Sequence, residues 1–171
     1  MSGPEGSSIK NVRLCVMVFI KEEIIMDDRE YMKVAYEEAM KARMSDEVPI
    51  GAIIVKDGEI IAQANNQKET LQDVSAHAEM LAIQKACQVL GTWHLDGCTL
   101  YSTLEPCMMC SGAIIQSRIT RVVIGARGQR WHGLLQYLSS HEFNHKPEVE
   151  TGILEEECST LISNYFKTKR A

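Results

Sequence analysis

The chain has 171 residues, of which 45% are hydrophobic and 24% are charged. These proportions and this length suit one globular domain with a real core, and they exclude a collagen, a coiled coil and a wholly disordered chain. The net charge of −5 argues against a nonspecific nucleic-acid binder, but it does not exclude a basic patch on part of the surface.

The first 25 residues precede the part of the chain with a clear structural pattern. Lys10 and Arg13 come before a short apolar run at 14–20, which loosely resembles a signal peptide, but no small-residue cleavage site follows it. The run is also too short to span a membrane. We expect residues 1–25 to be an N-terminal extension that the chemistry does not need, and residues 26–171 to form a single domain.

The first periodic segment predicts a helix over residues 28–43, which Asp27 or Asp28 can cap. A β-branched run follows at 48–55. A Lys-Asp-Gly turn then leads into a second strand at 59–64, so the two segments predict a β-hairpin.

The middle of the chain alternates helix and strand. After a polar loop, residues 78–90 are apolar nearly all round and predict a buried helix, which Gly91 ends. A strand is expected at 98–103. Pro106 then opens a helix at 107–117, because proline is favoured in the first turn.

The last third of the chain begins with an expected strand at 121–125. Residues 126–147 are predicted to be a loop with a short apolar stretch at 134–138. The chain ends with a helix whose apolar stripe comprises Leu154, Cys158, Leu161, Ile162 and Tyr165. Strands that alternate with helices predict a layered α/β domain, and the initial hairpin makes its sheet mixed.

The six cysteines are Cys15, Cys87, Cys98, Cys107, Cys110 and Cys158. An even number permits a disulfide framework. However, the chain is not short, and Cys87 and Cys158 lie in apolar helical patterns that are typical of buried free thiols. We therefore expect a reduced, cytoplasmic protein.

Two short motifs each lie at the predicted start of a helix: a His-Ala-Glu sequence that begins at His77, and a Pro-Cys-Met-Met-Cys sequence that contains Cys107 and Cys110. The two cysteines are one helical turn apart, and the positive helix end favours their thiolates. His77 can supply a third ligand. Three protein ligands leave a position for water, which is typical of catalytic zinc, and zinc suits this donor set better than iron.

Glu79 follows His77 by two residues and so does not share its helix face. At a helix end, however, a metal ion can lie within reach of both, and a carboxylate beside an activated water is suited to carrying protons. His94 is the nearest candidate for a fourth ligand, but we expect it on the far side of the helix. A Cys-x-x-Cys alone can also be redox-active or half of a zinc ribbon; the combination of motifs favours a catalytic zinc site.

These residues match the signature His-x-Glu followed by Pro-Cys-x-x-Cys, and through them the chain resembles the zinc-dependent cytidine and deoxycytidylate deaminase superfamily. Within it, the sequence is most similar to bacterial tRNA adenosine deaminases, which convert adenosine to inosine at the anticodon wobble position. The similarity covers roughly residues 28–170. Beyond the two motifs it rests on segments 47–52, 100–105, 117–119, 125–127, 144–145 and 165–167.

The resemblance implies a three-layer α/β/α cytidine deaminase-like sandwich around a mixed five-stranded sheet, usually as a homodimer. It implies one Zn²⁺ per subunit held by His77, Cys107 and Cys110. It further implies that Glu79 is the catalytic proton shuttle and that Asn66 hydrogen-bonds the purine ring. Without the resemblance, Asn66 can also be read as a polar residue at the end of a strand or in a turn.

Residues 128–135 depart from the family pattern. Relatives usually carry an acidic or polar residue and then a glycine-rich stretch, whereas this chain reads Gly-Gln-Arg-Trp-His-Gly-Leu-Leu. In the family this loop touches the anticodon nucleotides. Two kinds of substrate are therefore considered: adenosine in a tRNA anticodon loop, and a free purine base or related small amino-heterocycle, such as guanine or adenine, under an apolar lid.

Local charge favours RNA. Residues 106–133 hold four arginines and no acidic residue, and the end of the chain adds a second basic spot. These cations are Arg118, Arg121, Arg127, Arg130, Lys167, Lys169 and Arg170. The arginines can also be a solvated face, and Trp131 or His132 can stack on a base or pack in the core. A non-catalytic zinc-binding subunit is a third possibility, against which the presence of Glu79 argues.

Overall fold

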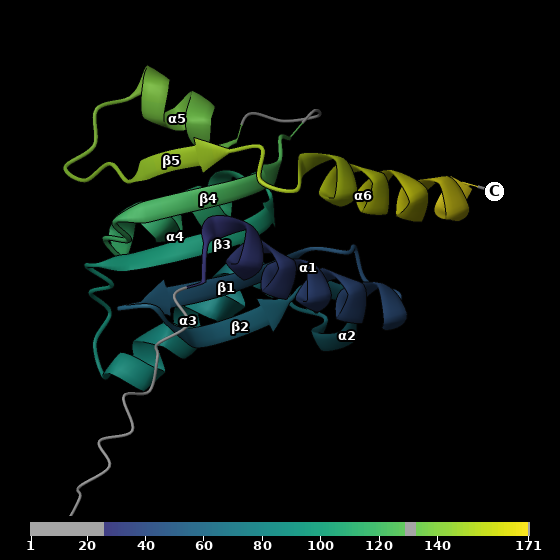
Figure 1. Cartoon of the computed structure of the whole chain (residues 1–171), viewed down its shortest axis with the longest axis horizontal. Coiled ribbons are helices and arrows are strands. Elements are labelled where there is room, and N and C mark those ends of the chain that lie inside the picture. Colours follow the sequence, from purple (N-terminus) through teal and green to yellow (C-terminus); the bar gives the residue numbers. More distant parts are fainter. Residues whose placement is uncertain (1–25, 129–132, 171) are drawn as a thin grey trace, which may run out of the picture.

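The computed structural model of the chain describes residues 26–128 and 133–170, which form a three-layer α/β/α sandwich (Figure 1). The five strands are β1 (Gly51–Lys56), β2 (Glu59–Asn65), β3 (Cys98–Leu104), β4 (Arg121–Ala126) and β5 (Glu148–Thr151). The helices are α1 (Asp28–Met44), α2 (Lys68–Leu71), α3 (Ala78–Leu90), α4 (Met108–Gln116), α5 (Leu134–Ser140) and α6 (Glu155–Arg170). The fold class expected from the sequence is confirmed.

The sheet is mixed, with the strand order β2-β1-β3-β4-β5. Strand β1 runs antiparallel to both β2 and β3, whereas β3, β4 and β5 run parallel to one another. Alternate residues of the central strands face opposite layers. Ile53 and Val123 pack with α1 and the start of α6, while Ile54 and Val122 pack with α3 and α4, so each face of the sheet has its own core.

The elements differ from those read from the sequence in several places, and strand β5 is one that the hydrophobic pattern did not predict. Helix α3 is not buried all round, because Gln84, Lys85, Gln88 and Val89 are exposed on its outer side. The polar loop before it contains α2, and the predicted loop at 126–147 contains α5. Pro106 lies before the helix rather than in its first turn, because Cys107 is the N-cap of α4. Residues 1–25, expected to be dispensable, lie outside the described residues.

One edge of the sheet collects the ends of several elements. The carboxyl ends of β3 and β4 lie there, and so do the end of β2 and the start of β1, since β1 runs antiparallel to its neighbours. A hydrogen bond from the backbone N–H of Gly51 to Oγ1 of Thr103 (3.1 Å) ties β1 to β3 at this edge. Helices α3 and α4 begin beyond the same edge, which brings distant segments of the chain together.

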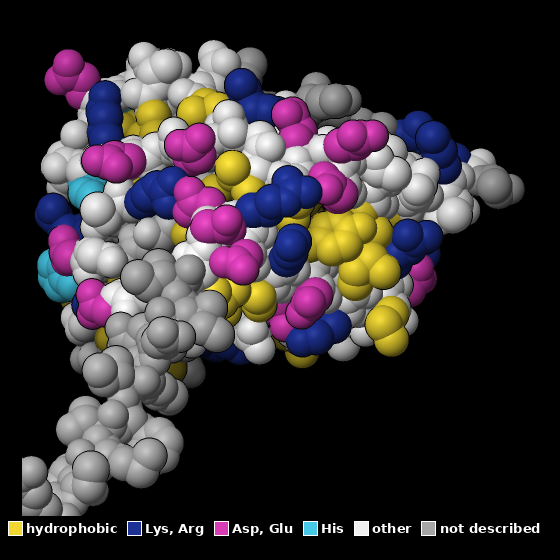
Figure 2. Space-filling model, viewed as in Figure 1, with side chains coloured by type: hydrophobic (Ala, Val, Ile, Leu, Met, Phe, Trp, Pro, Cys, Tyr) yellow, Lys and Arg dark blue, Asp and Glu magenta, His cyan; other side chains and the backbone are white. Residues whose placement is uncertain are grey.

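Helix α1 covers the front of the sheet, and its first turn is anchored at the opposite edge. Asp27 caps the helix in a capping box with Glu30. Asp28 accepts two hydrogen bonds from the guanidinium of Arg121 (2.8 and 2.7 Å) and a third from the hydroxyl of Tyr101 (2.8 Å). On the face shown in Figure 2, acidic and basic side chains are interspersed over α1.

No helix in the two described ranges is long and apolar enough to cross a membrane. The cysteines at positions 87, 98, 107, 110 and 158 are all free thiols, and the sixth, Cys15, lies outside the described residues.

We expect Asp28→Asn to lower the free energy of unfolding by about 1 kcal/mol at neutral pH, because it removes a half-buried ion pair. The hydrogen bonds from Arg121 lower the pKa of Asp28 below its ordinary value of 3.8. Its contribution is therefore complete above that value and is lost as the pH falls below it, so the difference from wild type shrinks in acid.

Urea unfolding at several pH values measures this effect. Asp27→Asn is the matched control, since asparagine caps a helix as well as aspartate does. Equal losses in both variants would show that the loss of a negative charge at the start of α1, not the ion pair with Arg121, destabilises the fold.

Candidate active site

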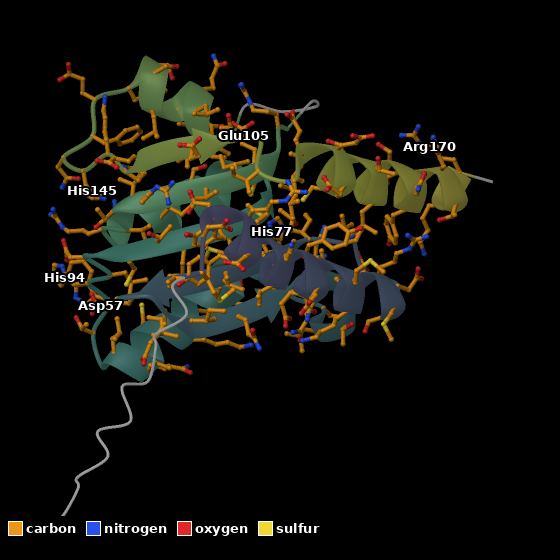
Figure 3. The ribbon with its side chains drawn as sticks, viewed as in Figure 1. Asp57, His77, His94, Glu105, His145 and Arg170 are labelled. Carbon is orange, nitrogen blue, oxygen red and sulfur yellow. The ribbon has the colours of Figure 1, made fainter. Side chains whose placement is uncertain are left out.

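Three side chains that could hold a metal ion converge at the edge of the sheet where α3 and α4 begin. His77 is the N-cap of α3, Cys107 is the N-cap of α4, and Cys110 lies in the first turn of α4. Nδ1 of His77 lies 3.7 Å from Sγ of Cys107 and 3.6 Å from Sγ of Cys110, and the two sulfurs are 3.7 Å apart. In Figure 3, His77 lies in the middle of the molecule, whereas His94 lies at its far edge.

These separations fit a tetrahedral zinc ion. Zn–S bonds of about 2.3 Å and a Zn–N bond of about 2.0 Å require ligand atoms roughly 3.5 to 3.8 Å apart. The donor set of two sulfurs and one imidazole is also one that zinc prefers. Among the described residues, no fourth histidine, cysteine or carboxylate joins the cluster. A tetrahedral ion bound here would therefore keep one open position, as catalytic zinc sites do.

The charge of the cluster also suits a cation. The hydrogen bond between the two sulfurs lowers the pKa of Cys107 to about 4 and raises the pKa of Cys110. The hydrogen bond with Cys107 raises the pKa of His77. One sulfur is therefore anionic at neutral pH, and a thiolate is the form that binds metal.

Glu79 lies beside this cluster in the first turn of α3, with only 2% of its surface exposed. Burial raises its pKa to about 6. Its Oε2 atom is buried and has no hydrogen-bond partner among the described residues. A buried carboxylate oxygen without a partner costs free energy, so its presence beside three metal-ligand atoms indicates that a bound group completes the site.

Asn66 directly follows β2 and is 4% exposed. Its backbone N–H donates to the carbonyl of Ile50 (3.0 Å), and the N–H of Gln67 donates to the carbonyl of Ala76 (3.0 Å), next to His77. Asn66 is thus held at the same sheet edge as the metal-ligand atoms.

Two buried carboxylates support the site, and the sequence analysis missed both. Glu47 is fully buried and accepts a hydrogen bond from Nδ2 of Asn66 (3.2 Å). Glu105, just before Pro106, accepts backbone hydrogen bonds from Gly128 (3.0 Å) and Leu135 (3.2 Å). The sequence signal for both is an acidic residue next to an apolar strand. A carboxylate buried at such a position needs hydrogen-bond donors and so indicates a structural role.

The carboxylate of Glu105 contacts described residues on both sides of the segment whose sequence departs from the family pattern. The Nε atom of Arg127 lies 3.5 Å from its carboxylate. Gly133 packs so closely that a β-carbon there would come within 2.5 Å of the Glu105 side chain. Trp131 and His132, which the sequence suggests for stacking on a base, lie outside the described residues.

A cavity of about 300 Å³ opens at the same sheet edge, between the ends of β3 and β4 and helix α6. Its apolar lining includes Ile50, Leu104 and Phe166, and its cations are Arg127, Lys167 and Arg170. A pocket that combines apolar surface with several cations suits an anion that carries a flat or apolar group. In Figure 3, Arg170 marks the far end of α6.

The described arginines of residues 106–133 do not gather in one patch. Arg118 and Arg121 lie at the start of β4, and Arg127 lies just beyond its end, about 20 Å away at the usual rise per residue. Arg121 is also paired with Asp28. Around the cavity at this sheet edge, the cations are instead Arg127 and the residues at the end of α6, which the sequence suggests as a second basic spot.

Comparison with known proteins agrees with this geometry. Residues 26–170 match the family model of MafB19-like deaminases. The chain is 52% identical, over 84% of its length and 91% of the relative's, to a tRNA-specific adenosine deaminase of Bacillus subtilis (strain 168).

Two solved structures bear on the substrate. One comes from a study of A-to-I editing by tRNA:A34 deaminases at the wobble position of transfer RNA; it is 41% identical, has a TM-score of 0.73, and aligns with 77% of this chain and 97% of its own. A guanine deaminase of Bacillus subtilis is 33% identical, has a TM-score of 0.59, and aligns with 85% of this chain and 94% of its own. The chain therefore belongs to the MafB19-like deaminase family, is a hydrolytic deaminase, and is a homologue of bacterial tRNA-specific adenosine deaminases.

Proposed function

We propose that this protein deaminates adenosine to inosine at the wobble position of a tRNA anticodon loop. The observation that carries the chemistry is the convergence of His77, Cys107 and Cys110 at tetrahedral spacing beside Glu79, whose Oε2 atom has no hydrogen-bond partner in the described part of the chain. The substrate is supported by relatives that are 42% to 52% identical and are named tRNA-specific adenosine deaminases.

In this proposal, His77, Cys107 and Cys110 hold one Zn²⁺. When bound, zinc supplies a water whose pKa is lowered to near neutrality and which is therefore a ready nucleophile. Glu79 accepts the proton of the attacking water at Oε2 and delivers it to ring nitrogen N1, beside the amine-bearing carbon. It then moves a second proton to the amino group, which leaves as ammonia. Adenosine and water thus become inosine and ammonia.

The side chains around the metal ligands orient the base. Asn66 hydrogen-bonds the purine ring, and its burial keeps water from competing for its amide. The neighbouring cavity, with Phe166 among apolar residues and Arg127, Lys167 and Arg170 as cations, is suited to nucleotides that flank the target base. In Figure 2, dark blue side chains gather at the end of α6, which is consistent with phosphate contacts there.

A free purine base is the second candidate substrate. It is favoured by the similarity to guanine deaminases, including one of Nitrosomonas europaea that is 27% identical with a TM-score of 0.71. The cations around the cavity favour RNA over a neutral base, because a base alone offers them no anion.

We also infer a homodimer in the cytoplasm. Exposed apolar side chains, among them Leu71, Val74 and Met108, lie near the site, where a second subunit can cover them. A tRNA substrate and the free thiols fit a reducing compartment. Residues 26–171 form the whole catalytic domain in this proposal, and residues 1–25 are not required for turnover.

We expect Cys110→Ala to lower the zinc content from about one ion per chain to almost none, because two ligands hold an ion far more weakly than three. Elemental analysis of the purified protein measures this content. Cys87→Ala, a half-buried cysteine of α3 outside the cluster, is the control and should retain the metal. Active wild-type protein without stoichiometric metal would refute the metal site.

We expect Glu79→Gln to reduce ammonia release by about 10²- to 10⁴-fold, the usual contribution of a proton-transferring group. The substitution preserves the size of the side chain, so the zinc content should be unchanged. Glu37→Gln, on the exposed side of α1, controls for the loss of a surface charge. Wild-type turnover by Glu79→Gln would remove Glu79 from the mechanism.

We expect strong turnover of an anticodon stem-loop with adenosine at the wobble position, and weak turnover of a panel of free purines. With a few phosphate contacts, kcat/KM on the stem-loop should fall on the order of tenfold between about 50 and 200 mM salt. The double variant Lys167→Ala, Arg170→Ala should raise KM for the stem-loop, and Lys33→Ala on α1 should not. Turnover of a free purine with none of the stem-loop would select the second candidate.

A further inference from the structure

Glu47 is a fully buried carboxylate with no cation beside it among the described residues. It lies between α1 and β1, at the sheet edge that carries the active site. Three N–H groups converge on it instead. The backbone N–H of Thr70 donates to Oε1 (2.6 Å), while the backbone N–H of Glu69 and Nδ2 of Asn66 each donate to Oε2 (3.2 Å).

Two of these hydrogen bonds have a structural purpose. Helix α2 has only four residues, and its N-cap, Gln67, makes no side-chain capping bond. Glu47 supplies the capping acceptor from a distant part of the chain. This capping role does not require the third hydrogen bond, the one from the Asn66 side chain.

The third hydrogen bond fixes which way the Asn66 amide points. A carboxylate only accepts hydrogen bonds, so the NH₂ group of Asn66 must face Glu47 and its Oδ1 atom must face the other way. No donor from the described residues is hydrogen-bonded to Oδ1. Asn66 is therefore left with one free acceptor, Oδ1, and one remaining N–H, side by side.

We propose that Glu47 is a positioning residue that selects adenine by holding Asn66 in this single orientation. An asparagine amide pairs with adenine through two hydrogen bonds, accepting from the 6-amino group and donating to N7. The fixed orientation of Asn66 presents this acceptor and this donor. The inference rests on the proposed function, in which Asn66 binds the purine.

Replacing Glu47 by glutamine should reverse the orientation of Asn66. The backbone N–H of Thr70 makes the shortest contact, 2.6 Å to Oε1, so we expect the glutamine oxygen to take that place, and the backbone N–H of Glu69, 3.2 Å from Oε2, then loses its acceptor. The glutamine NH₂ group then faces Asn66, which must turn its own Oδ1 toward it. The Asn66 groups that face the purine are then exchanged, so that an oxygen opposes N7 and an NH₂ group opposes the 6-amino group.

The test compares kcat/KM on two anticodon stem-loops that carry adenosine or 7-deazaadenosine at the wobble position, since the deaza base lacks N7. We expect wild type to prefer adenosine by about tenfold or more. Glu47→Gln should lower adenosine turnover and bring this preference close to one. In an Asn66→Ala background, Glu47→Gln should leave the preference unchanged, because the two residues act as one unit.

A purely structural role for Glu47 would lower kcat/KM equally on both stem-loops, and an unchanged preference in Glu47→Gln would overturn the proposal. Glu69→Gln, an exposed side chain on the same short helix, is the matched control. Glu47→Asp keeps an acceptor-only group and should retain the adenosine preference; it decides the question if the glutamine variant does not fold.

The proposed function can fail separately. Wild type that releases no ammonia from the adenosine stem-loop would refute wobble deamination whatever Glu47 does. The same preference is then measured on free adenine and 7-deazaadenine, which differ at the same ring position. Equal wild-type turnover of those two bases would refute the role of Glu47 as well.

Discussion

The active site depends on one geometric constraint: two helices from separate parts of the chain must begin within a few ångströms of each other. Nδ1 of His77 and Sγ of Cys107 lie 3.7 Å apart although thirty residues separate them in sequence. The sheet meets this constraint because β3 leads directly into α4, while α3 precedes β3 and crosses the sheet from the same edge. Both ligand-bearing helix ends are positive, which stabilises the thiolate that a metal ion needs.

Buried carboxylates set the positions of the surrounding groups. Glu47 holds Asn66 and caps α2, and Glu105 holds backbone N–H groups on both sides of the segment near Arg127. In each case the donors come from segments more than fifteen residues away, so the carboxylate joins parts of the chain that no secondary structure connects. Glu79 differs from both, since one of its oxygens has no partner within the described residues. This difference distinguishes Glu79, the group proposed to react, from Glu47 and Glu105, which hold other residues in position.

The sequence predicted the long elements because their hydrophobic patterns are strong. Elements α1, α3, β3 and β4 lie close to their expected bounds, and α6 forms where the apolar stripe predicted a final helix. Helix α2 has only four residues and β5 is largely exposed, so neither carries a period that could be recognised. The metal-ligand cluster was predictable because its residue types and spacing are specific. The pairing of Arg121 with Asp28 was not, because the two are 93 positions apart and only the folded sheet brings them together.

The position of the ion pair between Asp28 and Arg121 also has a consequence for attaching a tag to the protein. Arg121 begins β4, whereas the metal-ligand cluster lies beyond the carboxyl ends of β3 and β4. The described part of the chain therefore begins at the edge of the sheet opposite the metal-ligand cluster. An affinity tag, fluorophore or surface tether joined ahead of Met26 starts at that opposite edge. The approach to the metal-ligand cluster then stays open to a macromolecule as large as a folded RNA.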